Sequence, residues 1–135
     1  MALCTQTINV ADNTPPALTI PANATRECGG NTAPGGAGGT GFASAIDNCT
    51  ISPLITFIDV VNDGVCPVRH VISRSWKATD SCGNQTTLIQ TITVTDLTNP
   101  TITCPGPISV ECLANVPAPS FVGGSASDVC DPTVT

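Results

Sequence analysis

Polar and apolar residues alternate with a period of two along much of the chain. The run Thr-Ile-Thr-Val-Thr at 91–95 shows this most simply, and residues 54–60 and 68–78 follow the same pattern. A period of two is typical of a β-strand with one buried face. Turn residues bound these runs, for example NDG at 62–64 and CGN at 82–84. No segment of useful length has helical periodicity, so the pattern predicts an all-β protein.

The turns also predict the direction of each strand. Residues 67–79 and 86–95 are joined by the short turn SCGN, so they should run antiparallel. Following the chain backwards, we expect 53–60 and 17–27 to run in the direction of 86–95, and 42–47 to run the opposite way. Several short strands in a unit of this size predict an antiparallel β-sandwich.

Two parts of the chain share one sequence pattern. Residues 6–28 (QTINVADNTPPALTIPANATREC) and 90–112 (QTITVTDLTNPTITCPGPISVEC) align without a gap at an offset of 84, with 11 identities in 23 positions. The match resumes at SAIDNC, 44–49, against SASDVC, 125–130. Repetition at a fixed spacing is typical of tandem modules.

The repeat divides the chain into three parts. We predict the closing strand of a preceding repeat at 1–12, a complete repeat at 13–96, and the N-terminal part of a following repeat at 97–135. The Gly-rich residues 29–41 are expected to form a flexible crossing within the complete repeat. Neither an export signal nor a membrane-spanning run is visible, which suggests an excerpt from a longer chain.

The corner SWKATDSCGN at 75–84, with QTITVTDLTNPTITCP at 90–105, resembles the hyalin-repeat (HYR-like) module. The most specific parts are W-x-A-T-D-x-C-G-N and the linker T-D-x-T-x-P, and the resemblance covers nearly the whole chain. It implies immunoglobulin-like β-sandwich repeats in tandem, as in large secreted and surface proteins, many of them bacterial. It further implies adhesion or structural spacing, with no catalytic centre in the module.

Composition favours a disulfide-stapled protein outside the cytoplasm. Only 3% of the 135 residues are aromatic, so the core must be thin, and eight Cys are available to reinforce it. A zinc site is disfavoured because C-x-x-C spacing is absent and there is one His. The formal charge of -6 disfavours nucleic acid and anionic lipid as partners, and it leaves divalent cations as candidates. We therefore expect an extracellular or cell-surface location.

The strand directions predict two disulfides. Cys28 and Cys66 should lie at one end of the sandwich, and Cys49 and Cys82 at the other. A disulfide requires Cα atoms about 4.4–6.8 Å apart, so we predict Cys28–Cys66 and Cys49–Cys82. The cysteines expected to pair outside this excerpt, or between subunits, are Cys4, Cys104, Cys112 and Cys130.

Alternation places one set of side chains from 68–78 on the inner face. This set contains His70, Arg74 and Trp76, so His70 is interpreted as a packed side chain rather than a catalytic base. Arg74 would need a partner if buried, with Glu27 or Asp59 as candidates, unless it reaches solvent at the sheet rim. The predicted core comprises Ile72, Trp76, Phe57, Ile92 and Val94.

Acidic and amide side chains recur in loops at the end that holds the SCGN turn. The predicted calcium ligands there are Asp12, Asp47, Asp80 and Asn84, and the next repeat has Asp96 and Asp128 at the corresponding linker and loop positions. Ca²⁺ takes six to eight oxygen ligands, so convergence of these loops would suit it. The alternative is that Asp and Asn serve only as turn formers. No other cofactor is expected.

The function expected from these features is that of a non-catalytic extracellular structural or adhesive repeat: a surface adhesin, stalk or filament subunit. Its partners would be neighbouring repeats or identical subunits, joined by strand or edge pairing. One alternative is a carbohydrate-binding module with a surface glycan as ligand, or an ice-binding module, for which the Thr row at 91–95 is the feature. Another is an accessory domain of a secreted enzyme.

Overall fold

The computed structural model describes residues 3–118 and 123–131, and nearly all regular structure in them is β-strand. The only described helix is a single 3₁₀ turn, η1 (Leu113–Asn115). The all-β prediction is therefore confirmed. The strands are β1 (Ala17–Thr19), β2 (Ala24–Glu27), β3 (Ser44–Ile46), β4 (Leu54–Asp63), β5 (Val68–Thr79), β6 (Gln85–Thr95), β7 (Thr101–Thr103) and β8 (Ser125–Ser127).

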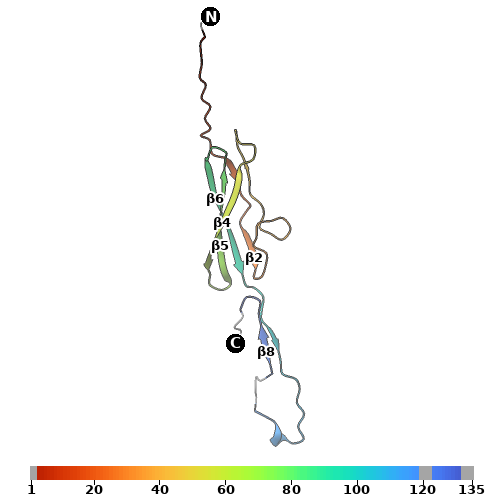
Figure 1. Cartoon of the computed structure of the whole chain (residues 1–135). Helices are drawn as coiled ribbons and strands as arrows, with labels where there is room; N and C mark the ends of the chain where they lie inside the picture. The colour runs from red at the N-terminus through yellow and green to blue at the C-terminus, as the bar shows by residue number, and fades with distance from the viewer. Residues whose placement is uncertain (1–2, 119–122, 132–135) are drawn as a thin grey trace.

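The largest sheet has four strands in the order β2-β6-β5-β4 (Figure 1). Strands β5 and β6 pair antiparallel through the SCGN turn, and β4 pairs antiparallel with β5 along its whole length. Strand β2 lies on the other side of β6 and runs parallel to it. These directions agree with those expected from the turns. Strand β4 is left at one edge of the sheet, with no partner on its outer side among the described residues.

Two small antiparallel pairs, β1–β3 and β7–β8, have the same register. Ala17 faces Ile46 in the first pair, and Thr101 faces Ser127 in the second. In the sequence alignment, Ala17 corresponds to Thr101 at an offset of 84, and Ile46 corresponds to Ser127 at an offset of 81. The sequence repeat is thus accompanied by equivalent strand pairing. The division into one complete and two partial repeats stays a prediction.

The apolar core is small and lies in two clusters. Leu18 of β1 packs with Trp76 and Ala78 of β5, which places the β1–β3 pair against the four-stranded sheet. Ile72, Ile92 and Val94 form the second cluster. Alternation along β5 is confirmed, since Ile72, Arg74, Trp76 and Ala78 are all buried.

The expectation that Phe57 belongs to the core is wrong. Its side chain remains 44% exposed, although its ring centroid lies 5.2 Å from that of Trp76. The reason is the position of β4, because an edge strand is covered by a neighbour on one side only.

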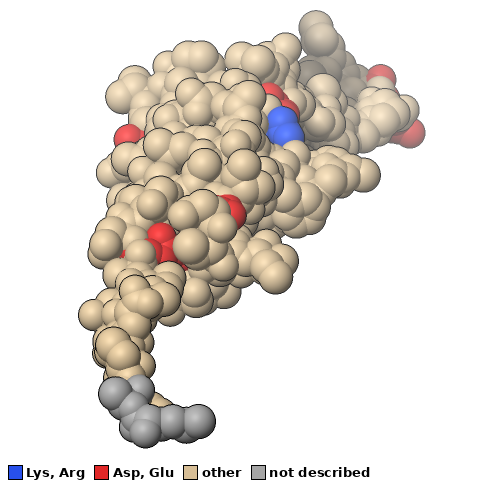
Figure 2. All heavy atoms as spheres, turned by 90° about the horizontal axis from the view of Figure 1, so that it is seen from above, with Lys and Arg blue, Asp and Glu red and all other residues tan. Residues whose placement is uncertain are grey.

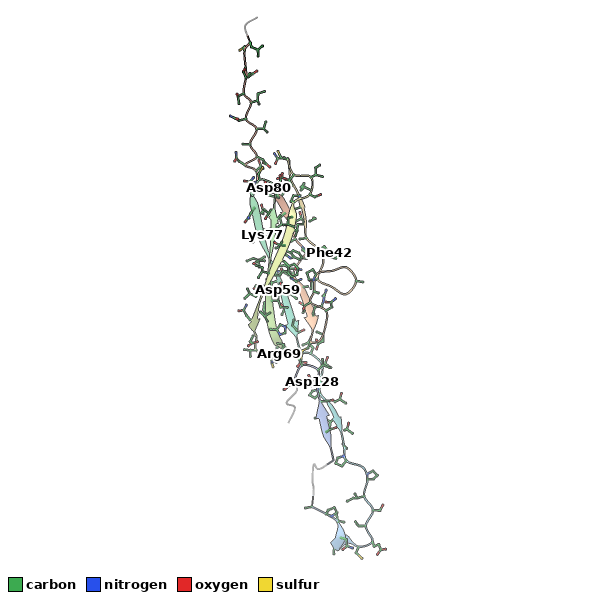
Figure 3. The ribbon with its side chains drawn as sticks, in the orientation of Figure 1. Phe42, Asp59, Arg69, Lys77, Asp80 and Asp128 are labelled. Carbon is green, nitrogen blue, oxygen red and sulfur yellow. A yellow bond between two sulfur atoms is a disulfide. The ribbon has the colours of Figure 1, made fainter. Side chains whose placement is uncertain are left out.

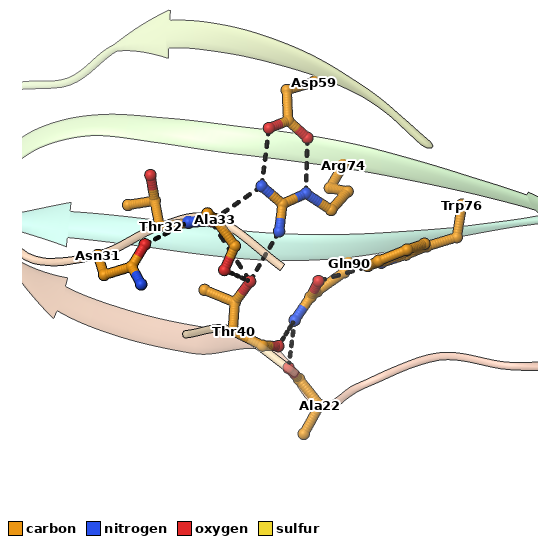
Figure 4. Close-up of polar contacts among 9 residues, drawn as sticks. All are labelled: Ala22, Asn31, Thr32, Ala33, Thr40, Asp59, Arg74, Trp76 and Gln90. Atoms are coloured by element: carbon orange, nitrogen blue, oxygen red, sulfur yellow. Dashed lines mark hydrogen bonds and ion pairs between the residues drawn. The ribbon is translucent and has the colours of Figure 1, made fainter. Parts of the chain in front are cut away.

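A buried polar centre lies between the four-stranded sheet and the Gly-rich residues 29–41 (Figure 4). Arg74 Nε and Nη2 donate to Asp59 Oδ1 and Oδ2 at 2.7 and 2.8 Å, so Asp59 rather than Glu27 is its partner. The remaining bonds of the guanidinium go to Thr40 Oγ1, at 2.7 Å, and to the carbonyl of Thr32, at 2.9 Å. Arg74 therefore does not reach solvent at the rim, and the paired interpretation is confirmed.

Gln90 extends this centre across β6. Its Nε2 donates to the carbonyls of Ala22 and Thr40 at 2.9 Å each, and its Oε1 accepts from Trp76 Nε1 at 3.1 Å. Arg74 and Gln90 thus hold Thr32 and Thr40, within the Gly-rich residues 29–41, by hydrogen bonds. The flexible crossing expected there stays a prediction. Gly35 and Gly41 also exchange backbone hydrogen bonds with each other, and the guanidinium of Arg26 donates to the carbonyl of Gly39.

Residues 3–16 and 104–112 form no strand. The closing strand predicted within 1–12 is thus not formed over 3–12, because no described part of the chain pairs with it; residues 1–2 lie outside the described residues. Within the described ranges, no helix is both long and apolar enough to cross a bilayer.

Candidate functional site

Three acidic side chains meet at the end of the sheet where the N-terminal segment enters. The carboxylate oxygens of Asp12, Asp47 and Asp80 lie within 4.8 Å of one another. They come from the N-terminal segment, from the loop after β3 and from the turn after β5. Figure 3 places Asp80 at this end, with Asp128 at the opposite end of the four-stranded sheet. The structure therefore brings together three of the predicted calcium ligands.

Hydrogen bonds within the local turns occupy one or both oxygens of each of these three carboxylates. Asp80 Oδ1 accepts from the backbone N–H groups of Cys82 and Asn84, and its Oδ2 accepts from Asn84 Nδ2 at 2.7 Å. Asp47 Oδ2 accepts from the backbone of Cys49. Asn84 Nδ2 also donates to the carbonyl of Asp12 at 3.1 Å, which ties the N-terminal segment to the turn after β5.

Two oxygens in this cluster have no hydrogen-bond partner among the described residues. Asp12 Oδ2 and Asp47 Oδ1 are both buried and unpaired. A buried carboxylate oxygen without a donor is costly, and a bound cation would remove that cost. Hard oxygen donors of this kind suit Ca²⁺. The donor set therefore fits a calcium ion, with Asp12, Asp47 and Asp80 as the residues that would hold it.

The surroundings of Asp80 favour its charged form. Burial opposes ionisation of Asp80, but hydrogen bonds from the Asn84 side chain and the nearby backbone outweigh it and lower the pKa of Asp80. Figure 2 looks down on this end and shows a surface that is mostly uncharged, with scattered carboxylates. Of the described Lys and Arg residues, none forms an ion pair with the cluster; the ion pair found joins Arg74 and Asp59.

The other predicted ligands are placed differently. Asn84 lies at the cluster but uses its amide nitrogen as a donor to Asp80 and Asp12. Asp128 Oδ1 accepts from the backbone of Cys130 at 2.7 Å, as expected of a turn former. Within the described ranges, Asp96 and Asp128 belong to no group of three metal-binding side chains.

The disulfide in the structure joins Cys28 to Cys130, with the Cα atoms 5.6 Å apart. The predicted Cys28–Cys66 bridge is therefore wrong, and so is the expectation that Cys130 pairs outside this chain. The strand order explains the error. Cys28 follows β2 and Cys66 precedes β5, and β6 lies between these strands. Two strand spacings amount to about 9.5 Å, which is beyond the reach of a disulfide.

The predicted Cys49–Cys82 bridge is not formed either, although the two loops meet. The hydroxyls of Thr50 and Ser81 are 2.9 Å apart, yet both thiols are free. The pKa of Cys49 is raised, first by desolvation and then by the negative charges of Asp12, Asp47 and Cys82. The remaining free cysteines, all exposed, are Cys4, Cys66, Cys104 and Cys112.

Some features bear on the alternative functions. Trp76 is buried and donates to Gln90, so it is not available to stack on a sugar. His70 is half-buried on β5. The Thr row at 91–95 is also half-buried, and Thr95 Oγ1 donates to the carbonyl of Arg26.

Sequence reasoning missed the polar centre formed by Thr32, Thr40 and Gln90. One signal was present, because Gln90 is identical to Gln6 at the same position of the repeat. A glutamine retained at an inward position of a strand indicates a buried polar role.

No protein-family model, curated protein or solved structure matches the chain.

Proposed function

We propose that the chain is a non-catalytic, extracellular structural repeat of an HYR-like array, in which consecutive immunoglobulin-like units are fastened to each other covalently. The observation that carries this proposal is the Cys28–Cys130 bond. It connects the end of β2, in the four-stranded sheet, with the loop after β8, beyond the linker 96–100. A disulfide between consecutive units limits their relative motion, which is what a stalk or spacer requires.

Hydrogen bonds hold the same linker. Glu27 Oε1 accepts from the backbone of Leu97 at 2.8 Å and from Thr98 Oγ1 at 3.0 Å. The backbone of Cys28 donates to the carbonyl of Thr95 at 2.9 Å, and that of Asp96 to the carbonyl of Pro67 at 2.8 Å. These hydrogen bonds hold the start of the linker 96–100 against the four-stranded sheet.

Calcium would act at the other end of the unit. Asp12 belongs to the N-terminal segment, whereas Asp47 and Asp80 belong to loops at the end of the β-sheets. A cation held by all three would tie the incoming segment to the unit that follows it. In this proposal one junction is fixed by sulfur and the other is stiffened by Ca²⁺.

The sulfur junction is tested by ¹⁵N relaxation of the full chain with and without reductant. We expect β7 and β8 to tumble with the four-stranded sheet when Cys28–Cys130 is intact, and more freely after reduction. Cys130→Ser should reproduce the reduced behaviour without reductant. Cys66→Ser is the matched control, because Cys66 is exposed and unpaired. Independent tumbling of the hairpin in the oxidised protein would contradict a structural role for the bond.

The calcium junction is tested by thermal unfolding. If Ca²⁺ binds only the folded chain, a concentration of 100 times Kd stabilises it by about 2.7 kcal/mol, and Tm rises by several degrees. Asp47→Asn should remove most of this shift. Asp63→Asn is the control, since Asp63 is exposed on β4. Equal shifts in both variants, or none in the wild type, would count against a calcium site.

A further inference from the structure

The N-terminal segment repeats a strand that is buried elsewhere in the same chain. By the alignment offset of 84, Ile8 corresponds to Ile92 and Val10 to Val94. Ile92 and Val94 are 0% and 4% exposed inside β6, whereas Ile8 and Val10 are 75% and 89% exposed. The same two side chains are thus covered in one copy of the pattern and uncovered in the other.

The residues that would pair with such a strand are also uncovered. In the four-stranded sheet β2 lies parallel to β6, with Ala24 opposite Ile92 and Glu27 opposite Thr95. The residues equivalent to β2 are 108–111, and they form no strand. Ile108 and Val110 are exposed. Transferring the register places Ile108 opposite Ile8 and Glu111 opposite Ala11.

Equivalent cysteines are likewise paired in one copy of the sequence pattern and unpaired in the other. Cys28 corresponds to Cys112, and Cys130 corresponds to Cys49. Cys28 and Cys130 are bonded to each other, whereas Cys112 and Cys49 are free and exposed. The local turns agree as well, since Cys49 and Cys130 each donate a backbone hydrogen bond to the aspartate two residues earlier.

A single copy does not bring these partners together. Residues 104–118, which follow β7 and include Cys112, lie at the opposite end of the molecule from the N-terminal segment (Figure 1). Cys49 lies at the N-terminal end, because its neighbour Asp47 meets Asp12 there. A second copy would supply the missing partner at each end.

We propose that copies of this chain join head to tail, with residues 8–11 of one copy parallel to 108–111 of the next and Cys49 of the first bonded to Cys112 of the second. This inference rests on the proposed structural function and names its partner. The two surfaces differ, so the contact is heterologous and propagates into an open filament instead of closing as a dimer.

Backbone and side-chain contacts of the existing junction predict those of the new one. Glu27 Oε1 accepts from the backbone of Leu97, so Glu111 of the second copy accepts from the backbone of Asn13 of the first. The backbone of Cys28 donates to the carbonyl of Thr95, so that of Cys112 donates to the carbonyl of Ala11. Strand addition of this kind gains affinity from the backbone and specificity from alternate side chains.

Bond formation is a thiol–disulfide exchange with a small-molecule disulfide as oxidant. The thiolate of Cys112 attacks one sulfur of the oxidant, forms a mixed disulfide and releases one small thiol. The thiolate of Cys49 then attacks the Cys112 sulfur of that mixed disulfide and releases the second small thiol. One small disulfide is reduced to two thiols, two protein thiols become one disulfide, and the two protons pass to the released thiolates.

The covalent link is tested with the full chain in a glutathione redox buffer. Non-reducing gels should show a ladder of oligomers, and mass spectrometry should map the linking bond to Cys49–Cys112. Cys49→Ser and Cys112→Ser should each abolish the ladder. An equimolar mixture of the two variants should give dimers and nothing longer, because each variant retains one half of the bond. Cys66→Ser, the matched control, should form the wild-type ladder.

Strand docking is tested by the rate of linking. Val10→Asp should slow formation of the Cys49–Cys112 bond about tenfold or more, because a buried valine contributes roughly that factor to affinity. Val65→Asp is the control, since Val65 is exposed in the loop between β4 and β5 and takes no part in the predicted pairing. Equal slowing in both variants would overturn the strand-docking part of the proposal.

Other outcomes overturn the linkage itself. These are a Cys49–Cys82 bond within one copy, a ladder that persists in Cys49→Ser, or the absence of any dimer from the mixed variants. Cys49→Ser retains Cys28–Cys130, so relaxation measurements on it test the proposed function independently. A hairpin held to the sheet in this variant, with no Cys49–Cys112 bond in the wild type, would refute the linkage alone.

Discussion

The ion pair of Arg74 provides the sharpest test of how this fold is stabilised. Asp59→Asn preserves the size of the side chain and removes its negative charge. Both charge-assisted hydrogen bonds to Asp59, at 2.7 and 2.8 Å, are then lost or replaced by weaker neutral ones. The contacts of Arg74 with Thr40 and Thr32 remain, but neither neutralises the buried guanidinium.

The magnitude follows from burial. Removing one partner of a buried ion pair costs about 3–5 kcal/mol. The Arg74 side chain is 2% exposed and that of Asp59 is 29% exposed, so water screens the pair in part and we take about 3 kcal/mol. With an m-value of about 2 kcal/mol per molar urea, the unfolding midpoint should fall by about 1.5 M.

The assay is urea unfolding of the disulfide-intact chain, followed by fluorescence. Trp76 is the only tryptophan, and its ring centroid lies 5.8 Å from the guanidinium carbon of Arg74, so it reports on this region. Asp63→Asn, at an exposed position of the same strand, should change stability by less than about 0.5 kcal/mol. Combining Asp59→Asn with Arg74→Met should cost less than the sum of the two, because no buried charge is left. If Asp59→Asn and Asp63→Asn have the same midpoint, the reasoning is refuted.

Three further predictions concern the buried polar centre, the Gly-rich segment and the linker. Gln90→Leu leaves two backbone carbonyls without a donor and should cost about 3 kcal/mol in the same urea assay; a cost below about 1 kcal/mol would mean that water replaces the amide. Gly41→Ala should destabilise by about 1–3 kcal/mol because φ is +89° and the added carbon would lie 2.8 Å from a neighbouring side chain, whereas Gly36→Ala, in open space, should have little effect. Glu27→Ala should accelerate amide hydrogen exchange at Leu97, and Glu27→Gln, which retains an acceptor, should do so less; equal rates in all three proteins would contradict the hydrogen bond.

Prediction from sequence succeeded where the signal is local. Alternation along 68–78 identified Ile72, Arg74 and Trp76 as inward residues, and all three are buried. Turn residues fixed the ends and directions of β5 and β6. The sequence also predicted that Asp12, Asp47 and Asp80 would converge, because loops at the same end of neighbouring strands lie near one another.

Prediction failed where the answer depends on which strands are neighbours. Phe57 alternates as a core residue should, but β4 lies at the sheet edge and leaves it partly exposed. The hydrogen bonds between Arg74 and the Gly-rich residues 29–41 were not predicted either, because 29–41 show no periodicity and Arg74 lies far along the chain. Neither outcome has a local sequence signal.

By itself, the sequence determined β5, β6, the inward face of β5 and the repeat, since period-two alternation and turn chemistry act between residues close together in the chain. Only the tertiary structure decided that β6 lies between β2 and β5, that Asp59 neutralises Arg74, and that Cys28 bonds with Cys130. The physical reason is that a disulfide or a buried ion pair requires two groups within a few ångströms. Strand order in the folded sheet, which a one-dimensional pattern does not specify, sets those distances.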